Sequence, residues 1–206
     1  MLLKGKIALK KYELTDETRT VEGKILHRIR ALRNFGDVKK GELGGFIESE
    51  KNLSHYDNCW IYQEALVYDK AWIVVDAKIF DNVKIFDTAE IFGKAKIFGY
   101  ACISGNTRVY GYARIFGNAK VSDNAKIFGY ACISGNTRVY GNARVYGNTV
   151  ISGNVEIFGD TWVHHNAKFF GNAKIFEKAE VYGNVIILGN AEVKGNTVVC
   201  GNEIMS

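Results

Sequence analysis

An aliphatic residue recurs at every sixth position of this chain, from Ile61 to Val199, and the series contains no insertion. Every position in it is Ile or Val except Phe169. A small or short residue stands four positions after each, in a second series from Ala65 to Thr197. A short fixed period is typical of a solenoid, in which each repeat packs against the next one. The six-residue period therefore predicts a solenoid.

The residues of one repeat unit indicate how it folds. In Lys126-Ile127-Phe128-Gly129, strand alternation points Lys and Phe outward and Ile inward. Gly and the Asn that often follows it tolerate positive φ, so they predict a corner, and the next Ala fills its narrow interior. Three units make one triangular coil. The chain is therefore predicted to be all-β, a single-stranded left-handed parallel β-helix with about eight coils in residues 59–206.

Residues 1–58 lack this period and are predicted to form an N-terminal cap that leads into the solenoid. Residues 10–14 and 24–32 indicate two strands of a β-hairpin around the polar turn TDETRT. Ile47, Leu53 and Cys59 then enter the inward register six residues apart. A cap is expected because an open solenoid end exposes unpaired strand edges. The outward residues of the first coil are apolar, as a covered surface requires: Trp60, Tyr62, Leu66, Tyr68, Trp72 and Val74.

The composition excludes several classes of protein. The 206 residues include no Pro, and no apolar run approaches the roughly 18 residues that cross a bilayer. The first residues lack the apolar centre of a signal peptide, so a cytoplasmic protein without membrane contact is expected. Cys59, Cys102, Cys132 and Cys200 are widely spaced without a CxxC pair, which argues against a disulfide or a zinc site. No metal site is predicted.

Basic residues gather between Lys94 and Arg144, where Asp123 is the one acidic residue. Outward residues 18 apart share a face of the prism, so cations and aromatic residues are expected to form columns. Such interleaving can bind nucleotides or nucleic acid by charge and stacking. The predicted ligand-binding residues are Lys96, Arg108, Arg114, Lys120, Lys126, Arg138, Arg144, Tyr110, Phe128 and Tyr146.

An alternative interpretation of the basic columns needs no ligand. Lys and Arg keep a solenoid soluble, and aromatic residues stack from coil to coil with high β-propensity. Residues 95–111 also recur letter for letter at 125–141, an offset that is not a whole number of coils. The copied outward residues therefore fall on a different face, which favours a scaffold over a catalyst in the middle of the rod.

The period and the N-terminal segment resemble hexapeptide-repeat proteins, the superfamily of left-handed β-helical acyltransferases and related binders. The stretches YELTDETRTVEGKILHRIRALRNFGDVKKGELGGFIESEKNLS and DNCWIY resemble more closely a phage and prophage group whose members are often named putative acetyltransferases. This resemblance covers nearly the whole chain. It implies the β-helix fold but specifies no reaction.

The superfamily implies one catalytic alternative, an acyl-CoA-dependent acyltransferase with acetyl-CoA as cofactor and a histidine general base. His164, on an outward position, is the candidate for that base, and His165 replaces a corner Gly. The loop that acyltransferases of this superfamily extrude from a coil is absent from the repeat, and adjacent histidines on a strand point apart. Two surface histidines without a cofactor are the other interpretation.

Outward positions near the C-terminal end turn aliphatic and predict a self-association surface. The predicted interface residues are Ile186, Leu188, Val198 and Trp162, and a homo-oligomer, either a trimer or a dimer, is expected. The favoured function is that of a non-catalytic binding or scaffold protein of phage origin in the host-cell cytoplasm. Its expected partner is a host protein that it blocks or sequesters, or a small anionic, nucleotide-like ligand, with nucleic acid as a further option.

Overall fold

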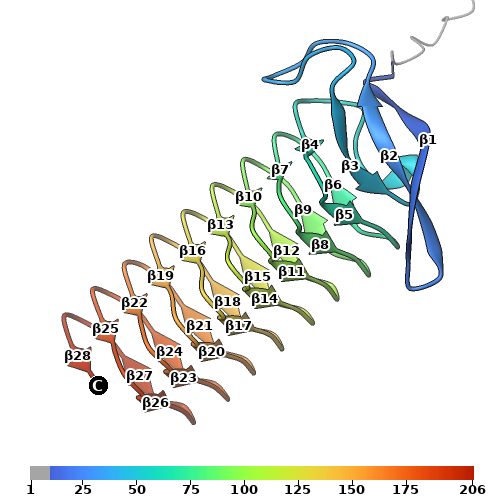
Figure 1. Ribbon diagram of the computed structural model, residues 1–206. Coiled ribbons are helices and arrows are strands. Elements are labelled where there is room, and N and C mark those ends of the chain that lie inside the picture. The colour runs from blue at the N-terminus through green and yellow to red at the C-terminus, as the bar shows by residue number, and fades with distance from the viewer. Residues whose placement is uncertain (1–9) are drawn as a thin grey trace, which may run out of the picture.

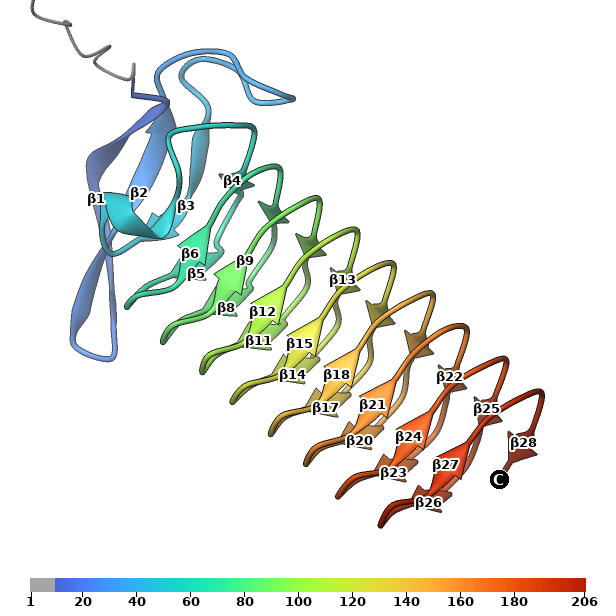
Figure 2. The ribbon, with the colours of Figure 1, turned by 180° about the vertical axis from the view of Figure 1, so that it is seen from behind.

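The computed structural model describes residues 10–206, which form a three-sided rod with a β-hairpin at its N-terminal end (Figure 1). Short parallel strands follow one another every six residues and form three sheets, which run along the three sides. The view from behind shows the same regular stack of coils (Figure 2). The predicted all-β parallel β-helix is confirmed, and its geometry fits the left-handed form. The expected eight coils approximate the nine strands of the second sheet.

The first sheet has 11 strands and includes the cap: β1 (Tyr12–Val21), β2 (Lys24–Ala31), β3 (Leu43–Ile47), β5 (Leu66–Val67), β8 (Lys84–Ile85), β11 (Cys102–Ile103), β14 (Lys120–Val121), β17 (Arg138–Val139), β20 (Glu156–Ile157), β23 (Lys174–Ile175) and β26 (Glu192–Val193). The second sheet has nine: β4 (Trp60–Ile61), β7 (Lys78–Ile79), β10 (Lys96–Ile97), β13 (Arg114–Ile115), β16 (Cys132–Ile133), β19 (Val150–Ile151), β22 (Lys168–Phe169), β25 (Ile186–Ile187) and β28 (Ile204–Met205). The third sheet has eight: β6 (Trp72–Ile73), β9 (Glu90–Ile91), β12 (Arg108–Val109), β15 (Lys126–Ile127), β18 (Arg144–Val145), β21 (Trp162–Val163), β24 (Glu180–Val181) and β27 (Val198–Val199).

The inward Ile and Val side chains form one continuous core along the rod. Phe169, the exception in the series, is fully buried and lies in register between Ile151 and Ile187. Burying each such side chain contributes on the order of 1.5–3 kcal/mol before chain entropy opposes it. Because the core positions stack in register, the inward side chains of each coil pack against those of the coil before it and the coil after it.

The corners use two solutions for positive φ. At Gly105, with φ of 65°, an added Cβ would lie 2.6 Å from the backbone nitrogen of Asp123 in the next coil. Asp87 takes the same conformation with φ of 58°, and its Oδ2 accepts a hydrogen bond of 2.9 Å from the Gly105 N–H. At an Asp corner, a hydrogen bond from the next coil to the carboxylate therefore offsets the strain of positive φ.

The hairpin of the cap differs from the prediction in the position of its turn. Strand β1 continues through the TDETRT segment, and the chain reverses at Glu22 and Gly23, which have φ of 51° and 80°. Val21 pairs with Lys24 across this two-residue turn, and a register shift between Leu14 and Thr18 absorbs the polar segment. Positive φ at both turn residues matches the right-handed twist of a hairpin, which explains why the chain reverses there.

The cap and the solenoid share one sheet. Strand β3 pairs antiparallel with β2 and parallel with β5, so Ile47 lies beside Val67, and Leu53 bridges to Ile73. Ile47, Leu53 and Cys59 are all buried as expected, but Cys59 takes a corner position rather than a strand position. The spacing of eight residues from Leu53 to Ile61 contains the two extra residues that cause this shift.

The cap covers two faces of the first coil. The outward side chains of Trp60, Leu66 and Tyr68 are buried against it, whereas Trp72 on the third sheet stays 49% exposed. A 3₁₀ helix, η1 (Glu50–Asn52), closes the junction, and Asn52 donates hydrogen bonds to the carbonyls of Asp69 and Ala71. No helix within residues 10–206 is long and apolar enough to span a membrane.

Candidate functional site

The parallel register confirms the columns of basic residues. Arg108 and Arg144 flank Lys126 on the third sheet, and Lys120 lies beside Arg138 on the first. Neighbouring coils are about 4.8 Å apart, so like charges in one column repel unless another group neutralises them. The second sheet carries the third column, Lys78, Lys96 and Arg114. The three columns differ in how many of their cations have a carboxylate partner.

The third sheet neutralises one cation of its own column. Arg108 Nε lies 2.9 Å from the carboxylate of Glu90, which precedes it in register. The Arg144 guanidinium lies over the Trp162 ring, 4.8 Å from its centroid. Lys126 has no ion pair among residues 10–206. One of the three cations is therefore paired with a carboxylate, and a second lies on an aromatic ring that leaves its charge in place.

From Arg138 onward, the first sheet alternates its charges. Arg138 donates to Glu156 at 3.2 Å, and Glu156 is followed in register by Lys174 and Glu192. A shallow groove runs beside this column. The groove is lined by side chains of the column and by Asn side chains of the adjoining corner: Asn118, Lys120, Asn136, Arg138, Asn154 and Glu156. Those Asn side chains donate to one another from coil to coil, from Asn118 to Asn136 to Asn154. This surface is polar, and its Arg138 is paired with Glu156, whereas Lys120 forms no ion pair among residues 10–206.

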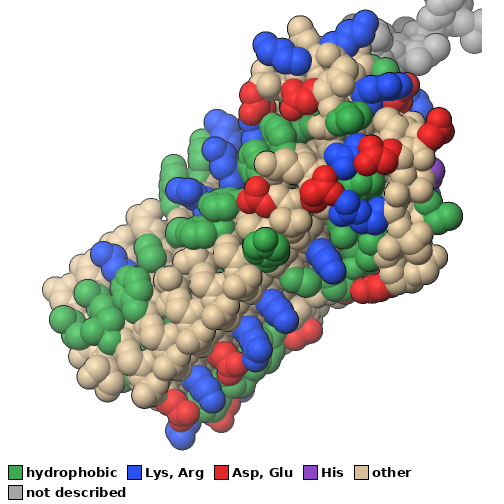
Figure 3. All heavy atoms as spheres, viewed as in Figure 1, with side chains coloured by type: hydrophobic (Ala, Val, Ile, Leu, Met, Phe, Trp, Pro, Cys, Tyr) green, Lys and Arg blue, Asp and Glu red, His purple; other side chains and the backbone are tan. Residues whose placement is uncertain are grey.

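The second sheet concentrates cations that have no carboxylate partner within the described residues. Lys94, Lys96 and Arg114 form no ion pair there, whereas Lys78 is held by Asp37 of the cap at 2.6 Å. Tyr112 and Tyr130 lie at the same corner, 48% and 62% exposed. These residues line one surface hollow, which we call the basic–aromatic patch: Lys94, Lys96, Arg114, Tyr112 and Tyr130. Figure 3 shows Lys and Arg side chains interleaved with hydrophobic ones along this side of the rod.

The predicted ligand-binding residues Tyr110, Phe128 and Tyr146 belong to a different structure. They are members of a column of six stacked rings that also contains Phe92, His164 and Tyr182, with centroids 4.6–5.1 Å apart. Each of their ring faces is covered by the next ring, so a base has no free face to stack on. This arrangement is the coil-to-coil stacking of the alternative interpretation.

His164, the proposed general base, is only 7% exposed within that column. Its Nε2 lies 3.0 Å from the Glu180 carboxylate, and its Nδ1 lies 2.6 Å from Nδ1 of His165. The carboxylate fixes the proton on Nε2, so His164 Nδ1 accepts from the His165 N–H. His165 is exposed and therefore presents the free ring nitrogen. Among residues 10–206, no cluster of three or more His, Cys, Asp or Glu could hold a metal ion.

The predicted interface residues separate into two groups. On the second sheet, Ile186 is half-buried and lies in register with Ile204, which is 70% exposed. Leu188 is also half-buried on this side. On the third sheet, Trp162 and Val198 are exposed but are separated in register by Glu180. The structure therefore assembles an aliphatic surface on the second sheet but no such surface from Trp162 and Val198.

Two polar clusters in the cap were not found from the sequence. Lys11 is fully buried, and its ammonium donates to the Cys59 carbonyl at 2.8 Å and contacts the Cys59 sulfur at 3.3 Å. Burial lowers the pKa of Lys11 and raises the pKa of Cys59. Without a repeat in this segment, the sequence carried no signal that this lysine faces inward.

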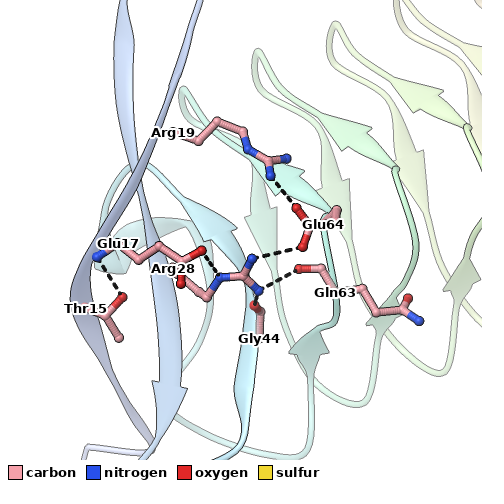
Figure 4. Close-up of polar contacts among 7 residues, drawn as sticks. All are labelled: Thr15, Glu17, Arg19, Arg28, Gly44, Gln63 and Glu64. Atoms are coloured by element: carbon pink, nitrogen blue, oxygen red, sulfur yellow. Dashed lines mark hydrogen bonds and ion pairs between the residues drawn. The ribbon is translucent and has the colours of Figure 1, made fainter.

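The second cluster joins the cap to the first coil (Figure 4). Arg28 reaches from β2 to the Glu64 carboxylate at 2.9 Å and to the Gly44 carbonyl at 3.1 Å. Arg19 also binds Glu64, and both guanidiniums lie 4.4 Å from the centroid of the Phe46 ring. These contacts position the cap and offer no open site.

Comparisons with known proteins agree with the solenoid. A family model described as the YdcK β-solenoid repeat matches residues 137–153. A curated protein of Escherichia coli (strain K12), described as the uncharacterized acetyltransferase YdcK, is 34% identical over 67 residues. That match covers 29% of this chain and 21% of the relative, so the similarity spans about a fifth of the relative's length. The likeness supports the repeat architecture.

Proposed function

We propose that the protein acts by binding an anionic ligand on its second sheet, through the basic–aromatic patch, without catalysing a reaction. The observation that carries this proposal is the arrangement of Lys94, Lys96 and Arg114. Three cations lie side by side there without a carboxylate partner among residues 10–206. A bound anion would relieve their mutual repulsion and gain charge-assisted hydrogen bonds.

The other basic columns support the choice of this patch. Glu90 holds Arg108 and Glu156 holds Arg138, so an anion would have to displace a carboxylate at either position. Arg114 contacts the Phe98 ring at 5.7 Å and Lys94 lies 5.3 Å from the Tyr112 ring, and neither contact consumes charge. The patch consists of cations and exposed phenol rings on a rigid sheet, a set that offers charge and stacking surface to a ligand.

The test is calorimetric titration with inorganic polyphosphate. Lys96→Glu with Arg114→Glu should weaken binding at least roughly tenfold, because each hydrogen bond to a charged group contributes about 1.5–3 kcal/mol. Lys120→Glu with Arg138→Glu is the matched control, since it changes the same residue types in neighbouring coils of the first sheet. Equal losses in both double variants would leave only non-specific attraction and overturn the proposed site.

One observation favours a second candidate function, acyl transfer from acetyl-CoA. Glu180, His164 and His165 form a carboxylate–imidazole–imidazole chain that ends at the exposed His165 ring, and a general base needs such an accessible, oriented nitrogen. The printed name of the E. coli relative, an uncharacterized acetyltransferase, is consistent with this candidate. The exposed His165 nitrogen would take the proton from a hydroxyl or amine acceptor, which would receive the acetyl group as CoA leaves as its thiol. CoA release from acetyl-CoA in the presence of a panel of such acceptors, abolished by His165→Ala, would support this candidate. Release that persists in this variant, or no release with any acceptor, would argue against it.

A phage origin, a cytoplasmic location and a host target remain parts of the proposal. A rigid rod that presents a cluster of unpaired cations could sequester an acidic host component without chemistry. Affinity capture from a host lysate, with the Lys96→Glu and Arg114→Glu variant as the comparison, would identify such a partner. Retention of the same proteins by the variant would contradict this role for the patch.

A further inference from the structure

We infer that the ligand of the basic–aromatic patch is single-stranded nucleic acid, with a base stacked on Tyr130 and phosphates beside Lys96 and Arg114. This inference rests on the proposed function and specifies its ligand class. It depends on the two tyrosines, which a simple anion would not need. Their rings are exposed on the same corner as the cations and differ from every other stacked pair on the rod in this respect.

The ring geometry leaves one stacking face available. Tyr112 and Tyr130 stack along the rod with centroids 5.0 Å apart and planes 9° apart. The next corner position is Asn148, and its amide is bound to Asn166 at 3.2 Å. No aromatic ring within residues 10–206 covers the outer face of Tyr130. A base placed on that face would continue the column at nearly the same spacing.

The cations lie on the other side of the tyrosine pair. Lys94 is bound over the Tyr112 ring, and Arg114 begins the strand that follows Tyr112, in register with Lys96. A nucleotide strand that runs along the rod would thus meet a stacking surface and then a row of positive charges. Aromatic stacking combined with cations that follow the backbone is how many proteins bind single strands without sequence readout.

Other polyanions fit this arrangement less well. Duplex nucleic acid keeps its base faces inside its own stack, so it would contact the cations alone. Polyphosphate has no planar group and would likewise ignore the tyrosines. The first sheet provides an internal contrast, because the hollow beside Lys120 and Arg138 is lined by Asn side chains, and the exposed ring of Tyr100, one coil before Asn118, has no stacked partner among residues 10–206. Stacking on tyrosine therefore separates single strands from all ligands bound by charge alone.

The experiment measures fluorescence anisotropy of labelled oligothymidine and oligouridine, a duplex of equal length, and competition by inorganic polyphosphate. Wild type should bind the single strands more tightly than the duplex. Tyr112→Leu with Tyr130→Leu should weaken single-strand binding roughly fivefold to 150-fold, which corresponds to about 1–3 kcal/mol for one stacked base. The same variant should bind polyphosphate as wild type does.

Three controls keep the result interpretable. Tyr112→Phe with Tyr130→Phe retains the rings and should retain affinity, so a loss in the Leu variant alone reports stacking. Tyr56→Leu removes an equally exposed tyrosine of the cap and should change nothing. Thermal unfolding of every variant should match wild type.

The outcomes distinguish the inference from the proposed function. Polyphosphate binding that needs Lys96 and Arg114, together with single-strand binding that the Leu variant does not weaken, would overturn the inference and preserve the proposed site. Absence of binding to every polyanion would overturn both. Preference for DNA or RNA would identify which source of single strands the patch accepts.

Discussion

Arg28 and Glu64 join the cap to the solenoid through a contact of 2.9 Å between the Arg28 Nη2 and Glu64 Oε1 atoms. Arg28 comes from a hairpin outside the repeat, and Glu64 occupies the corner between the second and first sheets. The arginine also contacts Glu17 and covers the Phe46 ring. A single guanidinium therefore connects all three strands of the cap, β1, β2 and β3, to the first coil.

Arg28→Ala should lower the free energy of unfolding by about 1–3 kcal/mol, because it leaves the Glu64 carboxylate and the Gly44 carbonyl short of a partner. Urea unfolding followed by circular dichroism measures this change. Arg30→Ala is the control, since Arg30 is exposed and pairs with Glu13 at the surface. If both substitutions cost the same, the junction does not depend on Arg28.

The cap should loosen in acid. Hydrogen bonds from Arg28 and Arg19 hold the pKa of Glu64 below its usual 4.5, and Lys10 with His55 does the same for Glu50. Carboxyls with lowered folded-state pKa values contribute stability above the unfolded-state value, and it is lost as pH falls through the lowered values. Hydrogen exchange at pH 7 and below pH 4 should show protection declining in residues 12–31 before the middle coils. Uniform loss along the chain would contradict this.

Ile127→Asp should destabilise the rod severely, by about 4 kcal/mol or more, because it buries an unpaired carboxylate between two fully packed coils. Lys126→Asp changes the adjacent outward residue and should alter the melting temperature little. Thermal unfolding by circular dichroism compares them. Similar melting temperatures for Ile127→Asp and wild type would be incompatible with the inward register.

The second sheet should also mediate self-association near its C-terminal end. Ile186, Leu188 and Ile204 form an aliphatic surface there, with Lys168 beside it in register. Ile186→Lys with Leu188→Lys should convert an oligomer into a monomer as measured by light scattering, since burying two ammonium groups in an interface is unfavourable. Lys174→Ala, on the first sheet, should leave the mass unchanged. A monomeric wild type at micromolar concentration would refute the proposal.

Lys11→Met should maintain or raise stability at pH 7, because the buried ammonium loses hydration that two carbonyl contacts only partly replace. The lowered pKa of Lys11 also means that the folded state binds fewer protons than the unfolded state just below pH 10.5. Wild-type stability from this group should therefore rise with pH in that window, and Lys11→Met should lack the rise. A large loss of stability in Lys11→Met would show that its hydrogen bonds outweigh the cost of burial.

The repeat made the solenoid predictable because one side-chain pattern determines strand, corner and core together. The same period places Tyr146 and Tyr182 one coil before and one coil after His164. It could therefore have predicted that the His164 ring is buried between these two rings. The period also places Glu90 one coil before Arg108, so it could have predicted that pair. It could not predict that Lys78 is paired, because Asp37 comes from the aperiodic cap. Lys11 and Arg28 were missed for the same reason.

The backbone hydrogen bonds of the rod run in one direction, as from the Lys168 N–H to the Val185 carbonyl and from the Ile186 N–H to the Glu203 carbonyl. Each coil therefore senses only the coil before it and the coil after it, as in a one-dimensional crystal. In such a lattice, surface residues can be exchanged one layer at a time without cooperative cost to distant layers. The number of coils therefore sets the length of the rod, and the outward residues of each coil set the local surface chemistry independently of distant coils.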